Sequence, residues 1–82
     1  MTYNEVETIV KEVLGKQLTM DVAKINLDSR LIEDLGIDSF GSVEVAFELE
    51  EKFNIKIPDA ALYEAKTVKN IVDYIASQKE SK

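Results

Sequence analysis

Ser39 is the residue best placed for covalent chemistry. It stands in the segment IEDLGIDSFGSVEVAFELEEKF (residues 32–53), between an acidic loop and a helix with an acidic face. A nucleophilic serine needs a base that takes its proton and a third group that orients the base. The chain has no histidine and no cysteine, and DSFGS lacks the glycine–x–serine–x–glycine turn of many serine hydrolases. We therefore expect that the chain has no catalytic residue and is not an enzyme.

Two other roles for Ser39 stay open from the residues alone. As an ordinary cap, a serine stabilises the start of a helix by about 1 kcal/mol. As the substrate of another enzyme, its hydroxyl would carry a phosphodiester near the positive end of the helix dipole and near free backbone N–H groups. The other enzyme would then supply the base and the metal ion that this chain lacks.

The spacing of apolar residues predicts an all-α bundle around this serine. Apolar residues at alternating steps of three and one predict three longer helices, over about 2–18, 39–53 and 67–78. Pro58 and Asp59 predict the start of one short helix, over about 59–65. Capping residues stand at three of the starts, namely Thr2 with Glu5 or Asn4 with Glu7, Asp38 or Ser39, and Thr67. We expect residues 1–82 to form a single domain.

Residues 19–38 show no sustained period and are predicted to form a long ordered loop with one short helical turn. Five side chains are too apolar for a disordered linker and should pin the loop to the core: Leu27, Leu31, Ile32, Leu35 and Ile37. Loops this long are uncommon in compact domains and are often functional.

The helix over 39–53 is assigned an apolar and an acidic face. At 100° per residue, the broad apolar face comprises Phe40, Val43, Ala46, Phe47 and Phe53, with Val45 and Leu49 at its edges. Glu44, Glu48 and Glu51 are assigned to the opposite face, next to Gly41. Three acids on a helix are by themselves typical of a solvated surface.

Composition excludes several classes of function. The 82 residues carry a net charge of −6, which disfavours nucleic acid as a partner and favours basic protein surfaces. Without cysteine or histidine, thiolate and imidazole metal sites are excluded, and we expect no metal site. The N-terminus lacks the basic start of a signal peptide, and no apolar run is long enough to span a membrane, so we expect a cytoplasmic location without membrane insertion.

The segment EDLGIDSFGSVEVAFELEEKFNIKIPD (residues 33–59) resembles the acyl carrier protein family. The resemblance rests on Asp38–Ser39, the apolar Phe40, the acidic helix and Ile57–Pro58, and the flanking helices extend it over nearly the whole chain. It implies that Ser39 receives 4′-phosphopantetheine from coenzyme A through a magnesium-dependent phosphopantetheinyl transferase, with Asp38 helping the transferase. The arm would end in a thiol that carries acyl groups as thioesters, so the thiol would be imported.

The resemblance also implies a docking face and an acyl pocket. Docking on basic patches of acyl-loading, elongating and acyl-transfer enzymes of fatty-acid, lipid or related biosynthesis is assigned to Glu44, Glu48, Glu51, Phe40 and Val43. Each pocket candidate also fits plain core packing, and these candidates are Val43, Phe47, Ala61, Leu62, Ile71, Tyr74 and Ile75. The implied carrier is a monomer.

Other functions remain as alternatives. DSFGSVE is also similar to carriers of D-alanine, so a D-alanyl or peptidyl-type carrier is the alternative within the family. Gly41, Lys52 and Lys56 stand where many fatty-acid carriers have acids, which favours a specialised carrier. The alternative from another class is a small acidic helical interaction module without a prosthetic group, in which Ser39 is only a cap.

Overall fold

The computed structural model describes residues 2–80, without the side chains of Ser39, Asp59, Leu62, Tyr63 and Glu80. Its elements are α1 (Tyr3–Leu18), the 3-10 helix η1 (Val22–Lys24), α2 (Ser39–Phe53), α3 (Asp59–Glu64) and α4 (Val68–Glu80). The all-α prediction is confirmed, and each of the four predicted helices begins and ends within two residues of its expected bounds. Within residues 2–80, extended pairing is limited to one bridge between Arg30 and Thr67.

Helix α1 begins at a capping box and runs through a buried glycine. Thr2 Oγ1 accepts a hydrogen bond from the Glu5 N–H, and Glu5 Oε1 accepts one from the Thr2 N–H. A glycine near a helix end usually weakens the last turn, but α1 continues past Gly15 to Leu18. The chain folds back so closely that a Cβ at Gly15 would lie 2.8 Å from the Met20 carbonyl oxygen, so only glycine fits there.

The loop over residues 19–38 is ordered by apolar side chains and contains η1, as predicted. Leu31, Leu35 and Ile37 are buried, and Leu27 packs against the core. The expectation for Ile32 is wrong, because its side chain is 75% exposed. Ile25 in this loop is also fully buried in the core, and the sequence pattern did not predict it.

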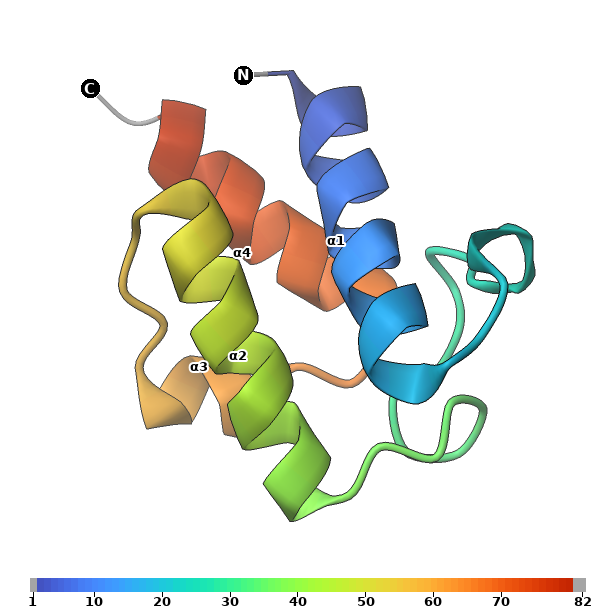
Figure 1. The fold of residues 1–82 in the computed structure, drawn as a ribbon. Coiled ribbons are helices and arrows are strands. Elements are labelled where there is room, and N and C mark those ends of the chain that lie inside the picture. The colour runs from blue at the N-terminus through green and yellow to red at the C-terminus, as the bar shows by residue number, and fades with distance from the viewer. Residues whose placement is uncertain (1, 81–82) are drawn as a thin grey trace.

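The four helices surround one hydrophobic core (Figure 1). Helix α1 packs against α4 and α2, and the short α3 packs against α2. The largest fully buried side chains come from every longer helix and from the loop: Phe53, Leu14, Ile25, Leu49, Ile75, Val6, Val10, Val68 and Val72. Over the described range 2–80, no helix is both long and apolar enough to cross a bilayer.

Polar contacts tie the helices together at their ends. The Tyr3 hydroxyl donates to Asp73 Oδ1 over 2.6 Å and joins the start of α1 to α4. Lys79 Nζ donates to the Phe53 carbonyl oxygen and so satisfies the last turn of α2. The segment between α2 and α3, residues 54–58, is called the strap here and is held by Glu50. Glu50 Oε2 accepts a hydrogen bond from the Ile57 N–H over 2.7 Å. The contacts of Lys79 and Glu50 fix the C-terminal end of α2.

Helix α2 is rotated relative to the orientation predicted from its sequence. Its buried residues are Val45, Ala46, Leu49 and Phe53, which cluster on one side of the helix. Phe40, Val43 and Phe47, assigned to the core face, are exposed, and they share the outer face with Glu44 and Glu51. The prediction of an apolar face opposite to an acidic face is therefore wrong for α2. Its outer face is mixed, apolar and acidic.

Candidate functional site

Ser39 is the first residue of α2, and Asp38 caps the helix in front of it. Asp38 Oδ1 accepts a hydrogen bond from the Gly41 N–H over 2.7 Å, and its carbonyl oxygen accepts from the Ser42 hydroxyl and the Ser42 N–H. The cap prediction is thus confirmed for Asp38. The side chain of Ser39 lies outside the described part of the structure, so its place rests on the backbone of α2.

The surroundings of Ser39 combine an exposed helix start with negative charge. Asp38 and Phe40, its two chain neighbours, are both exposed. The N-terminal end of α2 carries the positive end of the helix dipole, which suits a phosphodiester. In the preceding loop, Asp34 Oδ2 accepts a hydrogen bond from the Arg30 N–H. Among the described residues, no group of three or more acidic, histidine or cysteine side chains is arranged to hold a metal ion.

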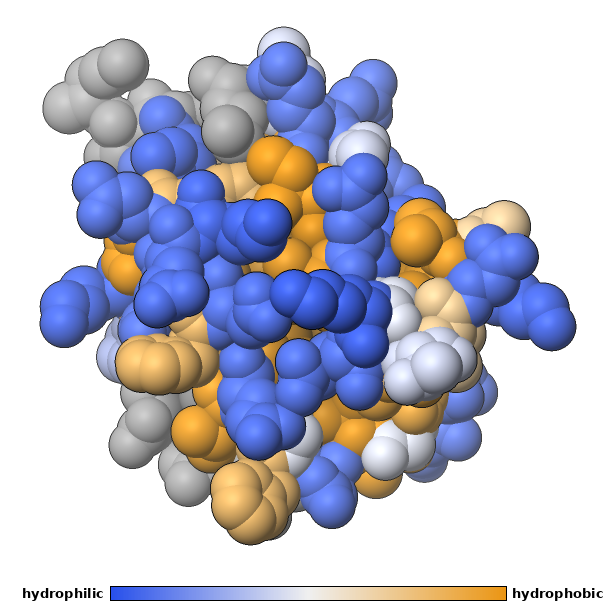
Figure 2. Space-filling model, in the orientation of Figure 1, coloured by the Kyte–Doolittle hydropathy of each residue, from blue (hydrophilic) through white to orange (hydrophobic). Residues whose placement is uncertain are grey.

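An apolar surface adjoins this helix start. Four large apolar side chains are more than half exposed: Ile32 (75%), Phe40 (76%), Val43 (59%) and Phe47 (67%). Figure 2 shows apolar surface interspersed with hydrophilic groups over α2 and at its N-terminal end. Together with Glu44 and Glu51 these side chains form what we call the recognition face. A patch of this kind on a small protein marks an interaction site.

Two acids predicted for docking already have partners on α1. Gln17 Nε2 donates to Glu44 Oε1 over 2.7 Å. Lys16 Nζ lies 3.9 Å from Glu48 Oε1, and the Glu48 side chain is only 30% exposed. Glu51 is exposed on the same helix. The last turn of α1 therefore borders the recognition face, a neighbourhood that the sequence pattern of α2 alone did not reveal.

A small apolar cavity of about 40 Å³ lies under α3, between α2 and α4. Of the predicted pocket residues, Ala61, Ile71, Tyr74 and Ile75 line it. Val43 and Phe47 do not line the cavity, because they lie on the exposed outer face of α2. The side chain of Leu62 lies outside the described part of the structure. The remaining lining residues were not predicted as pocket residues, namely Leu31, Ile37, Ser42, Val45, Leu49, Ile57, Ala65 and Asn70.

Bundle and site together define a class of protein, the small all-α domains with a serine at the start of a helix. Residues 4–75 match the family described as "Phosphopantetheine attachment site". An acyl carrier protein of Helicobacter hepaticus is 47% identical over 70 residues, which cover 85% of this chain and 92% of that protein. An acyl carrier protein of the Aster yellows witches'-broom phytoplasma is 46% identical over 66 residues, which cover 80% of this chain and 87% of that protein.

A solved structure agrees with these relatives. A Mycobacterium tuberculosis protein assigned as an acyl carrier protein superposes with a TM-score of 0.84 at 27% identity, covering 89% of this chain and 97% of that one. The chain belongs to the acyl carrier protein family, whose members carry covalently attached 4′-phosphopantetheine. The residues present fit this group, because an exposed helix start for its phosphate adjoins an apolar cavity.

Proposed function

We propose that Ser39 is the attachment site of the 4′-phosphopantetheine and that this chain is the substrate, not the catalyst, of the attachment. The observation that carries this proposal is the position of Ser39 as the first residue of α2, between two exposed neighbours. In the reaction, Ser39 Oγ forms a bond to the phosphorus that bears the pantetheine of coenzyme A. The pyrophosphate bond breaks, adenosine 3′,5′-bisphosphate leaves, and a base of the transferase takes the serine proton. When bound, the group supplies the thiol that forms thioesters with acyl chains.

Asp38 has two tasks in this proposal. Its carboxylate holds the first turn of α2 through Gly41, and its exposed side chain remains accessible to the transferase and its magnesium ion. A carboxylate is the ligand type that magnesium prefers in proteins. The residue therefore couples the order of the helix start to recognition of the serine beside it.

The recognition face is the proposed surface for partner enzymes. Its apolar centre, Phe40, Val43 and Phe47, can be buried against a partner, while Glu44 and Glu51 meet lysine or arginine at the rim. Glu48 contributes less, because it is half-buried beside Lys16. We assign to this face the transferase and the enzymes that load, elongate and transfer acyl groups in fatty-acid, lipid or related biosynthesis. A monomer working in the cytoplasm stays our prediction.

The cavity under α3 is the proposed entry point for the acyl chain. Its lining is almost wholly apolar, and Ile37 and Ser42, close to Ser39 in the chain, reach its wall. A volume of about 40 Å³ holds little more than a water-sized group, whereas a cavity that binds benzene measures about 150 Å³. An acyl chain must therefore displace α3 or the strap before it, which rests on the Glu50 contact to Ile57.

Intact mass tests the attachment. The chain is incubated with coenzyme A, magnesium and a broad-specificity phosphopantetheinyl transferase, beside Ser39→Ala and the control Ser42→Ala. The parent and Ser42→Ala should each gain one phosphopantetheine, whereas Ser39→Ala should gain none and keep its helical circular dichroism. Ser42 is the matched control because it lies one turn further along the same helix.

The same experiment separates the alternatives. No mass gain in the folded parent would contradict the proposal and leave the acidic interaction module, with Ser39 as part of a capped helix start. A mass gain would next be followed by loading with fatty acyl groups or with D-alanine by their respective ligases. Loading with D-alanine alone would identify a D-alanyl carrier.

A further inference from the structure

A second hollow, of about 500 Å³, lies between the long loop and the turn that joins α3 to α4. Its walls are formed by Arg30, Ile32, Glu33, Ala65, Lys66 and Thr67, and we call it the loop groove. Backbone contacts hold the walls together, because the Leu31 N–H donates to the Lys66 carbonyl oxygen over 3.0 Å and Arg30 bridges to Thr67. The groove is therefore a built feature of the fold and not a gap between loose loops.

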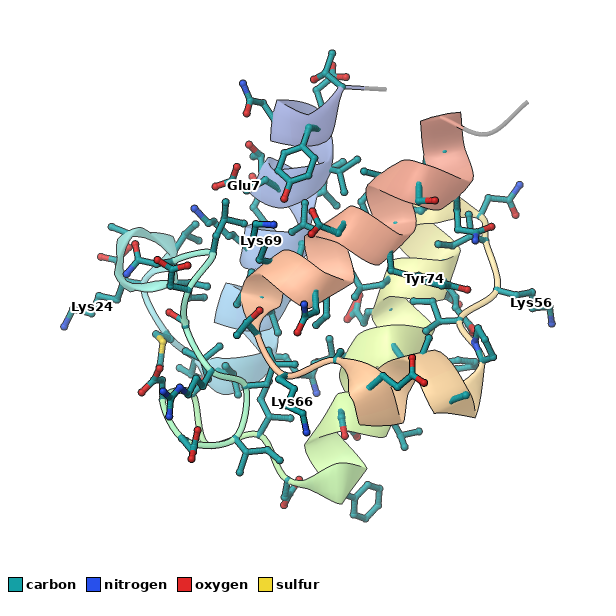
Figure 3. All side chains as sticks on the ribbon, turned by 180° about the vertical axis from the view of Figure 1, so that it is seen from behind. Glu7, Lys24, Lys56, Lys66, Lys69 and Tyr74 are labelled. Atoms are coloured by element: carbon teal, nitrogen blue, oxygen red, sulfur yellow. The ribbon has the colours of Figure 1, made fainter. Side chains whose placement is uncertain are left out.

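The loop groove lies within reach of Ser39. The Ile37 N–H donates to the Leu31 carbonyl oxygen over 2.9 Å, and Leu31 in turn is bonded to Lys66. Backbones joined in this way run about 5 Å apart, so Lys66 lies roughly 10 Å from a residue only two positions before the serine. In Figure 3 the Lys66 side chain points from the α3–α4 turn toward the N-terminal end of α2.

Lys66 offers a positive charge in an acidic neighbourhood. Among the described residues, no carboxylate lies within salt-bridge distance of its ammonium group, whereas Arg30 in the same groove is engaged by Glu33 over 2.9 Å. The helix start carries Asp38, and the loop before it carries Asp34, so a phosphodiester on Ser39 would meet negative charges there. The Lys66 ammonium group is the nearby cation that offsets them.

The groove also leads to the cavity. Ala65 lines the loop groove, the cavity under α3 and a third hollow of about 290 Å³ over α3 and α4. The small methyl side chain of Ala65 is therefore the shared wall between the outer groove and the apolar interior. A flexible chain lying in the groove would pass the mouth of the cavity at this residue.

We propose that the loop groove is the resting site of the phosphopantetheine arm, with Lys66 pairing with its phosphate and Ala65 leading its thiol end to the cavity. The inference rests on the proposed attachment at Ser39. The ligand class is a phosphodiester followed by a flexible amide chain. The phosphodiester matches the Lys66 ammonium group, and the amide chain matches the mixed polar and apolar walls of the groove. The loop groove shares only Ile32 with the recognition face.

Backbone amide NMR of the loaded and unloaded chain tests the inference. Loading is first confirmed by intact mass, so that failure of attachment is seen separately. In the parent, loading should shift the amide signals of residues 30–33 and 65–67 as well as those beside Ser39. Lys66→Gln should reduce the shifts in the groove by at least half, and Lys66→Glu should abolish them. The ³¹P signal of the arm should move toward that of free phosphopantetheine in both variants.

Lys24→Gln is the matched control, because Lys24 is an exposed lysine of η1 that lies far from Lys66 in Figure 3. It should leave the shifts unchanged. Full loading with shifts confined to residues 37–42 would overturn the groove as the resting site while leaving attachment at Ser39 intact. A Lys66→Gln pattern equal to that of the parent would overturn the role of Lys66. Absence of any mass gain would overturn both proposals, because no arm would be present.

Discussion

In our proposal Ser39 needs little from its own chain, because another protein performs the chemistry. The chain supplies a helix start, a capping carboxylate and exposed neighbours, and the proposal requires no base from it. The serine therefore has a function in our proposal although the chain has no histidine to activate it. The functional requirement at this scale is position, and Asp38 secures it through Gly41.

The Tyr3–Asp73 pair makes the stability of the bundle depend on pH at both ends of the scale. The hydrogen bond to Asp73 raises the pKa of Tyr3 to about 12, and the same bond lowers the pKa of Asp73. Because the pKa of Tyr3 is raised on folding, its contribution to the free energy of unfolding is complete below about pH 10. This contribution disappears between about pH 10 and 12. The contribution of Asp73 is present above its unfolded pKa near 4 and is lost as the pH falls through its lower folded value.

Replacing Tyr3→Phe should therefore flatten the stability profile at both ends. At neutral pH we expect a loss of about 1 kcal/mol or less, because the pair is only half-buried. Urea midpoints between pH 3 and pH 11 measure the effect. Tyr74→Phe is the control, since the Tyr74 hydroxyl donates to a backbone carbonyl and not to a carboxylate. An unchanged profile for Tyr3→Phe would show that the hydrogen bond does not persist in solution.

Helix α2 has a buried side that stabilises the fold and an exposed side that is available for binding. Phe53 is fully buried, whereas Phe47, on the same helix, is 67% exposed. Phe53→Ala should cost about 3–5 kcal/mol, a large part of the stability of a small domain. Phe47→Ala should change stability by less than about 0.5 kcal/mol. Urea denaturation of the two variants measures this difference.

Phe47→Ala, which should leave stability nearly unchanged, should affect binding. It should weaken the affinity for the phosphopantetheinyl transferase by about tenfold, because it removes a large apolar group from the recognition face. Titration calorimetry with the transferase measures the loss. Equal affinity of Phe47→Ala and the parent would place the docking surface elsewhere, and a large loss of stability would contradict the exposed position of Phe47.

Helix positions were predictable from the sequence because their signals are local. Apolar spacing and capping residues such as Thr2 with Glu5 act within a few neighbours along the chain, and they gave bounds close to those observed. The rotation of α2 was not predictable in the same way. Its apolar residues surround most of the helix, and only packing against the other elements decides that Leu49, and not Phe47, enters the core.

The candidate site divides along the same line. Asp38 as the cap and Ser39 as the first helical residue follow from a short motif, and the structure agrees with the cap. The cavity is built from the long loop, α2 and the stretch from Ile57 to Ile75, so residues such as Ile37 and Ala65 carried no recognisable signal. The pairing of Glu44 with Gln17 likewise depends on how α1 crosses α2.

For the molecule as a whole, charge is the main long-range property. The net charge is −6, and between Asp28 and Glu51 eight acids face a single base, Arg30. Association with a basic partner should therefore slow as salt is raised, while dissociation changes little. Stopped-flow binding to the transferase at rising ionic strength measures both rates.

Neutralising one rim acid tests where the charge acts. Glu51→Gln should lower the association rate by about two- to threefold at low salt, because Glu51 lies exposed on the recognition face. Glu12→Gln removes the same charge from an exposed position on α1 and should have a smaller effect. Equal effects of both variants would mean that only net charge matters and that the position of Glu51 does not.

The outward rotation of α2 has an evolutionary consequence. Phe40, Val43 and Phe47 can be exchanged for other side chains without a cavity or a clash forming in the core, because none of them is buried. A duplicated gene could thus acquire new enzyme partners by substitutions on one helix face while the protein stays as stable as its ancestor. Carriers dedicated to different pathways can diverge along this route within a single cell.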